Sequence, residues 1–284
     1  MQITQLFKRL GQPSDIDRYL KSGRIPWSPG YKQYRYNILK NIPTDQALLD
    51  VFARGEPLPQ NYGVGIDERI VEYPWLLSRL PGTSGLVLDG GSVLNYPFLL
   101  DAPQLSDKRL VILTLAPEST MAKRQNVSYM FGDLRETIFL DEVFDAIVSI
   151  STLEHVGMDN AKLYTQDDQH KESQPDDYLR VIKEFNRILK PGGHFLMTVP
   201  FGKAQNLGWL YQFDGQRLRQ AITAFGPEFT AATFYRYSSE GWLLSDEDAC
   251  ADCEYYDVHS ATVPAPDLAA AARAVACLEF VKHA

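Results

Sequence analysis

From residue 86 onwards, short apolar runs bounded by turn-forming residues alternate with segments in which apolar positions recur every three or four residues. Continuous apolar runs of this kind are typical of strands that are buried on both faces of a parallel sheet. The runs predict five strands, over residues 86–89, 110–113, 128–131, 146–150 and 194–199. Such strands alternating with helices predict a doubly wound α/β fold.

The clearest helical pattern lies between the fourth and fifth runs. Apolar residues recur from Leu179 to Leu189, and we expect Asp176 and Asp177 in the first turn, where carboxylates favour the helix dipole. The Lys-Pro-Gly-Gly sequence at 190–193 is predicted to end this helix.

Two further helices and a final strand are expected. Residues 215–225 carry a second amphipathic pattern, and Pro74 suits the first turn of a helix that continues to Leu80. The tail 274–282 fits either a helix or a strand, of which we favour a strand.

The first sixty residues read as short helices and turns. Ser14 is predicted to cap a helix that runs through Leu20, and a second short helix is predicted over 45–52. We expect two domains: residues 1–72 as an N-terminal helical extension on the acceptor side, and residues 73–284 as the α/β domain.

Composition excludes several classes of protein. The 284-residue chain is 45% apolar and 23% charged, as in globular proteins, and its net charge of −8 argues against a nucleic-acid binder. No apolar run approaches the roughly 18 residues of a membrane span, and no signal peptide is expected. Three cysteines cannot pair evenly, which favours a reducing compartment and a cytoplasmic location.

Polar residues and glycines follow the predicted strands, where an open parallel sheet binds its ligands. The turns after the strands contain residues 89–92, 114–118, 132–133, 151–157 and 200–203. A Gly-Gly turn after one strand is weak evidence alone, but here several neighbouring turns carry carboxylates or an imidazole. We therefore expect the ligand site at this edge of the sheet.

The motifs in these turns resemble those of class I S-adenosylmethionine-dependent methyltransferases. They are VLDGG, FGD, FDAIVSISTLEHVG and NRILKPGGHFLMTVPFG, in this order along the chain. The resemblance implies a Rossmann-like, seven-stranded, mostly parallel sheet whose seventh strand is antiparallel. The segments GIDERIVEYPW and FDGQRL are also similar to a bacterial subgroup that modifies glycans or secondary metabolites.

The resemblance also implies a cofactor, S-adenosylmethionine, with S-adenosylhomocysteine as product. Asp89 and the glycines after it would form the loop under the methionine part, Asp133 would contact the adenine amino group, and Ser151 would approach the methionine amino end. The cofactor-binding residues implied are Asp89, Gly90, Gly91, Ser92, Thr114, Glu118, Asp133, Leu134 and Ser151.

Two departures from the family pattern affect this site. The glycine loop keeps only Gly91, because Val93 and Asn95 stand at the later glycine positions. The acidic residue that usually holds the ribose aligns with Thr114, and the nearest carboxylate is Glu118. Either Glu118 reaches back to the ribose, or the ribose is held differently.

His155 is the candidate general base, because an imidazole titrates near neutral pH. Glu154 is the alternative, either as the base or as the residue that orients the histidine. A structural role of the pair, supporting the loop, stays open. No metal site is expected: Cys250 and Cys253 lack the further ligands of a zinc site, and His170 lies in a polar loop.

The acceptor site is expected between the N-terminal segment and the region after the fifth strand. An ion-pair cluster at the surface is the alternative role for Arg69 with its acidic neighbours. The long polar segment 157–174 could act as a lid. The candidate acceptor residues are Tyr62, Arg69, Tyr73, Lys203 and Gln212.

These observations favour an enzyme that transfers a methyl group to a small-molecule or glycan-type acceptor, at oxygen rather than at nitrogen or carbon. The degenerate glycine loop leaves open an inactive, cofactor-binding partner subunit. An oxidoreductase is disfavoured, because no Gly-x-Gly-x-x-Gly follows a predicted strand. We expect no nucleic-acid or membrane partner, and the oligomeric state stays open, with a homodimer as one option.

Overall fold

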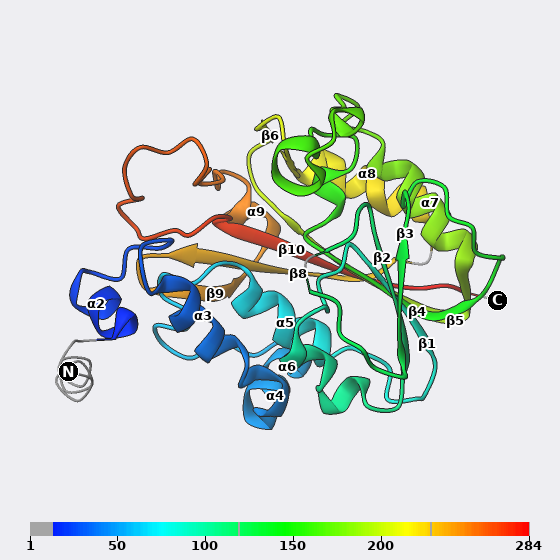
Figure 1. The fold of residues 1–284 in the computed structure, drawn as a ribbon, viewed down its shortest axis with the longest axis horizontal. Coiled ribbons are helices and arrows are strands. Elements are labelled where there is room, and N and C mark those ends of the chain that lie inside the picture. The colour runs from blue at the N-terminus through cyan, green and yellow to red at the C-terminus, as the bar shows by residue number, and fades with distance from the viewer. Residues whose placement is uncertain (1–13, 119, 228, 284) are drawn as a thin grey trace, which may run out of the picture.

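The computed structural model describes residues 14–118, 120–227 and 229–283. The N-terminal residues on which the signal-peptide expectation rests lie outside this description. The centre of the molecule is an eight-stranded sheet, shown in Figure 1. Its strands, in spatial order, are β3 (Val127–Phe131), β2 (Arg109–Thr114), β1 (Leu86–Gly90), β4 (Phe144–Ile150), β5 (Leu189–Pro200), β10 (Ala274–Val281), β8 (Phe229–Ser238) and β9 (Gly241–Ser245).

The sheet is parallel from β3 to β5, and β10 pairs antiparallel with both β5 and β8. The chain moves outward from β1 through β2 to β3 and then returns to β4 on the other side of β1. The strand order therefore reverses between β1 and β4, which is where an open α/β sheet forms its ligand crevice.

Helices cover both faces of the sheet, as Figure 1 shows. Two short strands, β6 (Gln205–Asn206) and β7 (Tyr211–Gln212), form a separate hairpin. The α-helices are α2 (Asp15–Lys21), α3 (Tyr31–Leu39), α4 (Gln46–Arg54), α5 (Arg69–Leu77), α6 (Pro97–Leu100), α7 (Tyr178–Ile188), α8 (Gly215–Phe225) and α9 (Glu247–Cys250). Shorter turns of other helix types are η1 (Ile42–Thr44), η2 (Pro103–Leu105), η3 (Leu153–His155), η4 (Ala161–Thr165) and η5 (Asp168–His170).

Each face of the sheet has its own apolar core. On β1, Val87 packs into one core with Trp75 of α5, whereas the next residue, Leu88, packs into the other with Phe185 of α7. This alternation follows from the two-residue period of a strand. Burial on both faces explains why the central strands β1 and β4 read as continuous apolar runs.

The five predicted strands, the helix over 215–225 and the C-terminal strand are confirmed, with small shifts at their ends. The expected seven strands are wrong by one: β9 extends the sheet beyond β8. At the N-terminus, Ser14 caps α2 and exchanges hydrogen bonds with Asp17. Asp45 caps α4 in the same way, by accepting a hydrogen bond from the backbone N–H of Leu48.

Two helix ends differ from the prediction. The last helix before β5 ends at Ile188, because Leu189 already has an extended backbone and opens the strand. Asp177 is the residue before α7 and does not lie inside its first turn. The side chain of Leu189 is fully buried in the strand, as it would be on the apolar face of a helix. The apolar pattern alone therefore does not distinguish the two structures at this residue.

Pro74 lies inside α5, whereas the sequence placed it at the start of a helix. A proline at this position has no N–H to donate to the carbonyl of Ile70, four residues earlier. The hydroxyl of Tyr62 donates to that carbonyl instead, at 2.7 Å. This compensation lets the helix begin at Arg69, so the predicted domain boundary at residue 72 falls within a helix.

Candidate active site

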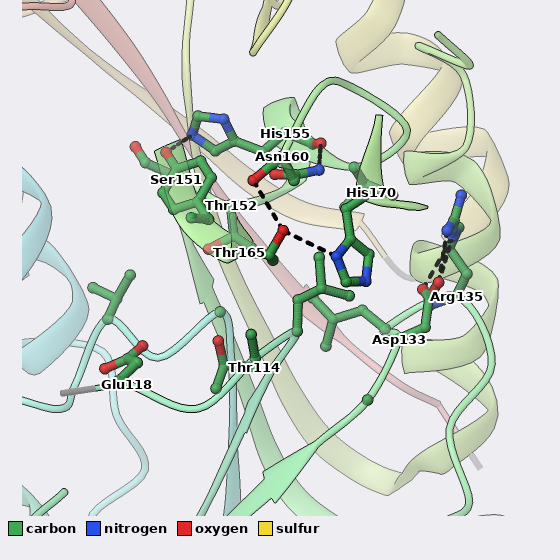
Figure 2. Close-up of a pocket in the computed structure, with 18 of the residues that line it drawn as sticks. Thr114, Glu118, Asp133, Arg135, Ser151, Thr152, His155, Asn160, Thr165 and His170 are labelled. Carbon is green, nitrogen blue, oxygen red and sulfur yellow. Dashed lines mark hydrogen bonds and ion pairs between the residues drawn. The ribbon is translucent and has the colours of Figure 1, made fainter. Parts of the chain in front are cut away.

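A pocket of about 550 Å³ lies at the carboxyl ends of β1, β2 and β4, where the strand order reverses. Figure 2 shows Thr114 and Glu118 on one side of it, with Asp133 and His155 on others. The volume is within the range of small-molecule sites. The candidate residues that line it are Arg69, Gly91, Thr114, Glu118, Asp133, Leu134, Ser151 and His155.

The turn after β1 is held by the buried carboxylate of Asp89. It accepts hydrogen bonds from the backbone N–H groups of Val93 (3.2 Å) and Leu94 (2.8 Å), and burial raises its pKa to about 7. Gly91 has φ of +122°, and a Cβ there would lie 2.1 Å from Oγ1 of Thr152. The sequence therefore keeps glycine at a position of the loop where a side chain cannot fit.

Gly90 and Ser92, which belong to the same loop, do not line the pocket. A Cβ on Gly90 would lie 2.7 Å from the ring of Phe185, so this glycine permits close packing of α7 against the sheet. Ser92 is buried, and its hydroxyl has no hydrogen-bond partner among the described residues. An unsatisfied hydroxyl in this loop is compatible with a polar ligand beside it.

The side of the pocket after β2 contains Thr114 and Glu118. Glu118 accepts a hydrogen bond from Nδ2 of Asn95 at 2.7 Å, and Asn95 Nδ2 also donates to the carbonyl of Thr120. The hydroxyl of Tyr129 donates to Oδ1 of Asn95 at 2.7 Å. The carboxylate of Glu118 is thus held by Asn95, which stands where the family pattern has a glycine.

Asp133 is engaged by Arg135, which the sequence analysis did not single out. Its carboxylate accepts from the backbone N–H, Nε and Nη2 of Arg135, and this pairing lowers its pKa against the opposing effect of burial. Arg135 also bonds Glu172 (2.7 Å) and Asp177 (2.6 Å). Leu134, between them in sequence, is buried and lines the pocket.

Ser151 directly follows β4, has a positive φ of +41° and lines the pocket. Its hydroxyl donates to Oε1 of Glu72 at 2.6 Å, and Thr198 of β5 donates to the same oxygen at 2.6 Å. The other oxygen of Glu72 accepts from Nη1 of Arg69. The Arg69–Glu72 pair is therefore buried in the site, which excludes the surface ion-pair alternative.

The tautomer of His155 follows from its contacts. Nδ1 lies 2.9 Å from the carbonyl oxygen of Trp209, which can only accept, so Nδ1 carries the proton and Nε2 presents a lone pair. The indole of Trp209 stacks on the imidazole, and the hydroxyl of Tyr164 lies 3.3 Å from Nε2. Burial lowers the pKa of His155 to about 4, so the imidazole is neutral at pH 7.

Glu154 lies beside this imidazole, with Oε1 at 3.7 Å from Nε2 of His155. The side chain is 2% exposed, and Oε2 has no hydrogen-bond partner within the described part of the chain. Burial raises the pKa of Glu154 well above its usual value, and the nearby carboxylate of Glu72 adds to this effect. The protonated carboxyl is favoured as a result.

The other candidate acceptor residues lie outside the pocket lining. Tyr62 is bonded to the backbone of α5, and Tyr73 is 1% exposed and packs in the core. Lys203 is at the surface, paired with Glu254 at 3.0 Å. Gln212 is fully buried, and its amide donates to backbone carbonyls of Lys203 and Cys253.

The segment 157–174 forms one wall of the pocket. Its ends meet where the backbone N–H of Gln174 donates to the carbonyl of Gly157 at 2.7 Å. Asn160, Thr165 and His170 line the pocket and form the hydrogen-bonded group in Figure 2. A lid function of this segment stays a prediction.

Residues that the sequence did not single out come from distant segments or from loops. Trp209 lies 54 residues after His155, and no local pattern connects the two. Arg135 stands two residues after Asp133, so a basic residue beside a strand-end carboxylate was an available signal. Within the described residues, no cluster of histidine, cysteine and carboxylate side chains suits a metal ion, and no helix is long and apolar enough to cross a membrane.

Comparison with known proteins points to the same class as the motifs. Residues 98–197 match the model of a methyltransferase domain. This match agrees with the resemblance of the motifs to class I S-adenosylmethionine-dependent methyltransferases, whereas the narrower bacterial subgroup is not confirmed.

Solved structures with similar folds have low sequence identity to this chain. A chain in the complex between the Haloferax volcanii Trm112 methyltransferase activator and a methyltransferase is 16% identical, with a TM-score of 0.48, covering 75% of this chain and 89% of that one. The 1,6-didemethyltoxoflavin-N1-methyltransferase of Burkholderia thailandensis is 15% identical, with a TM-score of 0.44, covering 89% and 86%. A search of the curated proteins finds no match.

Proposed function

We propose that the protein transfers the methyl group of S-adenosylmethionine to a hydroxyl group of a small-molecule or glycan-type acceptor. The observation that carries the proposal is the fixed tautomer of His155, whose Nε2 lone pair lies in a pocket at the strand ends. An acceptor hydroxyl can donate its hydrogen bond to Nε2 and is thereby oriented within the pocket.

The residues at the turn after β1 fit the cofactor that the class uses. Asp89 fixes the backbone of the loop, Gly91 lets this backbone pack closely against Thr152, and the buried hydroxyl of Ser92 has no partner among the described residues. We assign the methionine part to Asp89, Gly90, Gly91, Ser92 and Ser151. The adenosine part is assigned to Thr114, Glu118, Asp133 and Leu134.

When bound, the cofactor supplies an activated methyl group on a positively charged sulfur. The protein must then align the acceptor with this group, which contributes about 7–11 kcal/mol in favourable cases. The new oxygen–carbon bond would form as the carbon–sulfur bond breaks and S-adenosylhomocysteine leaves, and the proton of the acceptor hydroxyl would pass to Nε2 of His155. The carboxyl of Glu154 keeps its proton in this step, and its Oε1 lies 3.7 Å from Nε2 of the imidazolium.

A second candidate function is transfer to an amine nitrogen. It is favoured by the acidic surroundings of the site, where the buried side chains of Glu68, Glu72 and Glu154 lie near the single guanidinium of Arg69. Burial and the neighbouring Asp67 raise the pKa of Glu68 to about 7. An amine would be attracted to such surroundings in its ammonium form. It would release a proton to solvent before the transfer, because only the neutral amine carries the lone pair that attacks the methyl group.

The test is methyl transfer from radiolabelled S-adenosylmethionine to a panel of hydroxyl and amine acceptors, with wild type and His155→Gln. We expect transfer to a hydroxyl, a loss of about 10²-fold or more in kcat for the variant, and unchanged affinity for S-adenosylhomocysteine. A loss within about threefold would remove His155 as the base. Transfer to amines alone would favour the second candidate, and binding with no transfer to any acceptor would favour the inactive partner subunit. A cytoplasmic location and a homodimer stay predictions.

A further inference from the structure

Arg69 places a guanidinium at the inner end of the pocket. It is the first residue of α5, its side chain is 19% exposed, and it lines the pocket together with Gly91 and Ser151. Of the residues that the structure describes, Glu72 alone hydrogen-bonds this guanidinium, through Nη1. The N–H donors on Nε and Nη2 make no hydrogen bond to any residue that the structure describes.

The protein holds Arg69 in this position firmly. Glu72 is fully buried, and its second oxygen accepts from the hydroxyls of Ser151 and Thr198, both at 2.6 Å. Ser151 directly follows β4, and Thr198 lies near the end of the neighbouring strand β5. The guanidinium is therefore fixed to the sheet edge through a carboxylate that is itself bonded on every side.

The second arginine of the pocket shows the contrast. Arg135 bonds the carboxylates of Asp133, Glu172 and Asp177, and these contacts occupy Nε and both terminal nitrogens. Arg135 therefore has no N–H donor left for an anionic ligand. Arg69 is thus the pocket-lining arginine that can bind an anion.

A guanidinium has five N–H donors in a planar arrangement that matches a carboxylate with two parallel hydrogen bonds. Leaving a largely buried charged donor unsatisfied is costly, so a ligand that supplies two acceptors is favoured. We infer that Arg69 binds a ligand carboxylate, and that this is the carboxylate at the amino-acid end of the cofactor. The inference rests on the proposed function and moves Arg69 from the acceptor side to the cofactor side.

The neighbours of Arg69 favour the cofactor as the source of this carboxylate. Gly91 and Ser151, which line the pocket beside it, are the residues that we assign to the methionine part. Asp89, which holds the same loop, is close enough for Arg69 to act on its ionisation. A carboxylate on the acceptor is the other source of the same chemistry, and the experiment separates the two.

The experiment is calorimetric titration with S-adenosylhomocysteine and with 5′-methylthioadenosine, which lacks the amino acid part. Arg69→Lys keeps the charge beside Glu72 but loses the planar donors, and the double variant Arg69→Gln/Glu72→Gln removes both buried charges together. Each should weaken S-adenosylhomocysteine by about 10- to 100-fold and leave methylthioadenosine within about twofold.

Arg35→Gln is the matched control, because Arg35 is similarly buried and paired with Asp67 but does not line the pocket. It should leave the affinity ratio of the two ligands unchanged. Equal weakening of both ligands by the Arg69 variants would show that Arg69 only supports the pocket, and would overturn the inference.

Unchanged binding of S-adenosylhomocysteine would also overturn the assignment to the cofactor. A raised acceptor KM in the same variant would then identify the acceptor as the source of the carboxylate. If the wild type binds neither ligand, the proposed function itself fails, which is a separate outcome from a failure at Arg69.

Discussion

The side-chain amide of Asn95 donates a hydrogen bond to the carboxylate of Glu118, 23 residues further along the chain, at 2.7 Å. These residues belong to the two departures from the family pattern: a missing loop glycine and a missing acidic residue after β2. The hydroxyl of Tyr129 orients the side-chain amide of Asn95 by donating a hydrogen bond to its Oδ1. The two departures are therefore in direct contact, and Asn95 positions the carboxylate that we propose in place of the missing acidic residue.

This contact predicts coupled effects on cofactor affinity. Asn95→Ala and Glu118→Gln should each weaken binding of S-adenosylhomocysteine by about 3- to 20-fold, as expected for a lost hydrogen bond to a charged group. The double variant should be little weaker than either single variant, because contacting residues are not additive. Calorimetry on the four proteins measures the coupling, and additive losses would show that Asn95 does not position Glu118.

The low pKa of His155 predicts a dependence of stability on pH. The folded protein holds this imidazole neutral down to about pH 4, whereas the unfolded chain takes up the proton at its ordinary value of 6.5. Between these values the unfolded state binds the additional proton, so the free energy of unfolding should fall as the pH falls from 6.5 to 4. Denaturant unfolding of wild type and His155→Gln should show a smaller fall in the variant. A parallel fall in both proteins would show that His155 titrates normally in the fold.

The steric role of Gly91 can be separated from its backbone conformation. Gly91→Ala places a Cβ 2.1 Å from Oγ1 of Thr152, whereas Gly192, also at a positive φ, has open space around the same position. Both substitutions carry the backbone strain of a positive φ, but only Gly91→Ala should abolish binding of S-adenosylhomocysteine. Equal affinity in the two variants, measured by calorimetry, would argue against a close approach at Gly91.

Arg135 links the segment 157–174 to the body of the protein through its bond to Glu172. Arg135→Gln should remove the positive charge between the carboxylates of Asp133, Glu172 and Asp177, and their repulsion should loosen the segment. Hydrogen–deuterium exchange should rise over residues 158–174 by about tenfold, equivalent to about 1.4 kcal/mol of lost protection. Arg219→Gln, which removes an exposed pair with Glu247, is the control and should leave this segment unchanged. Unaltered exchange in Arg135→Gln would show that other contacts hold the wall.

The sequence indicates the sheet well, because its central strands, such as β1 and β4, are buried on both faces and read as continuous apolar runs. It fails at Pro74, where the broken helix bond is repaired by Tyr62 from outside the helix. It also fails at Leu189, whose burial is the same in a helix as in a strand. In both cases a tertiary contact decides the local structure.

The site is only partly readable for a similar reason. Residues directly after strands, such as Gly91, Asp133 and His155, reach the pocket because the fold brings all strand ends to one edge. Packing places three predicted acceptor residues outside the pocket lining, although they come from the N-terminal segment and the region after the fifth strand. They are Tyr62, Lys203 and Gln212. The side chains that bond the predicted residues, such as Asn95 and Arg135, depend on distances that no sequence pattern encodes.

The central claim is that the pocket at the β1–β4 edge binds the cofactor of a methyltransferase. Its most direct test is calorimetric titration of the wild-type protein with S-adenosylhomocysteine, with NADH as the comparison ligand. We expect micromolar binding of S-adenosylhomocysteine that weakens in Gly91→Ala, and no heat of binding with NADH. Absence of binding at millimolar S-adenosylhomocysteine, or binding of NADH in its place, would contradict the account.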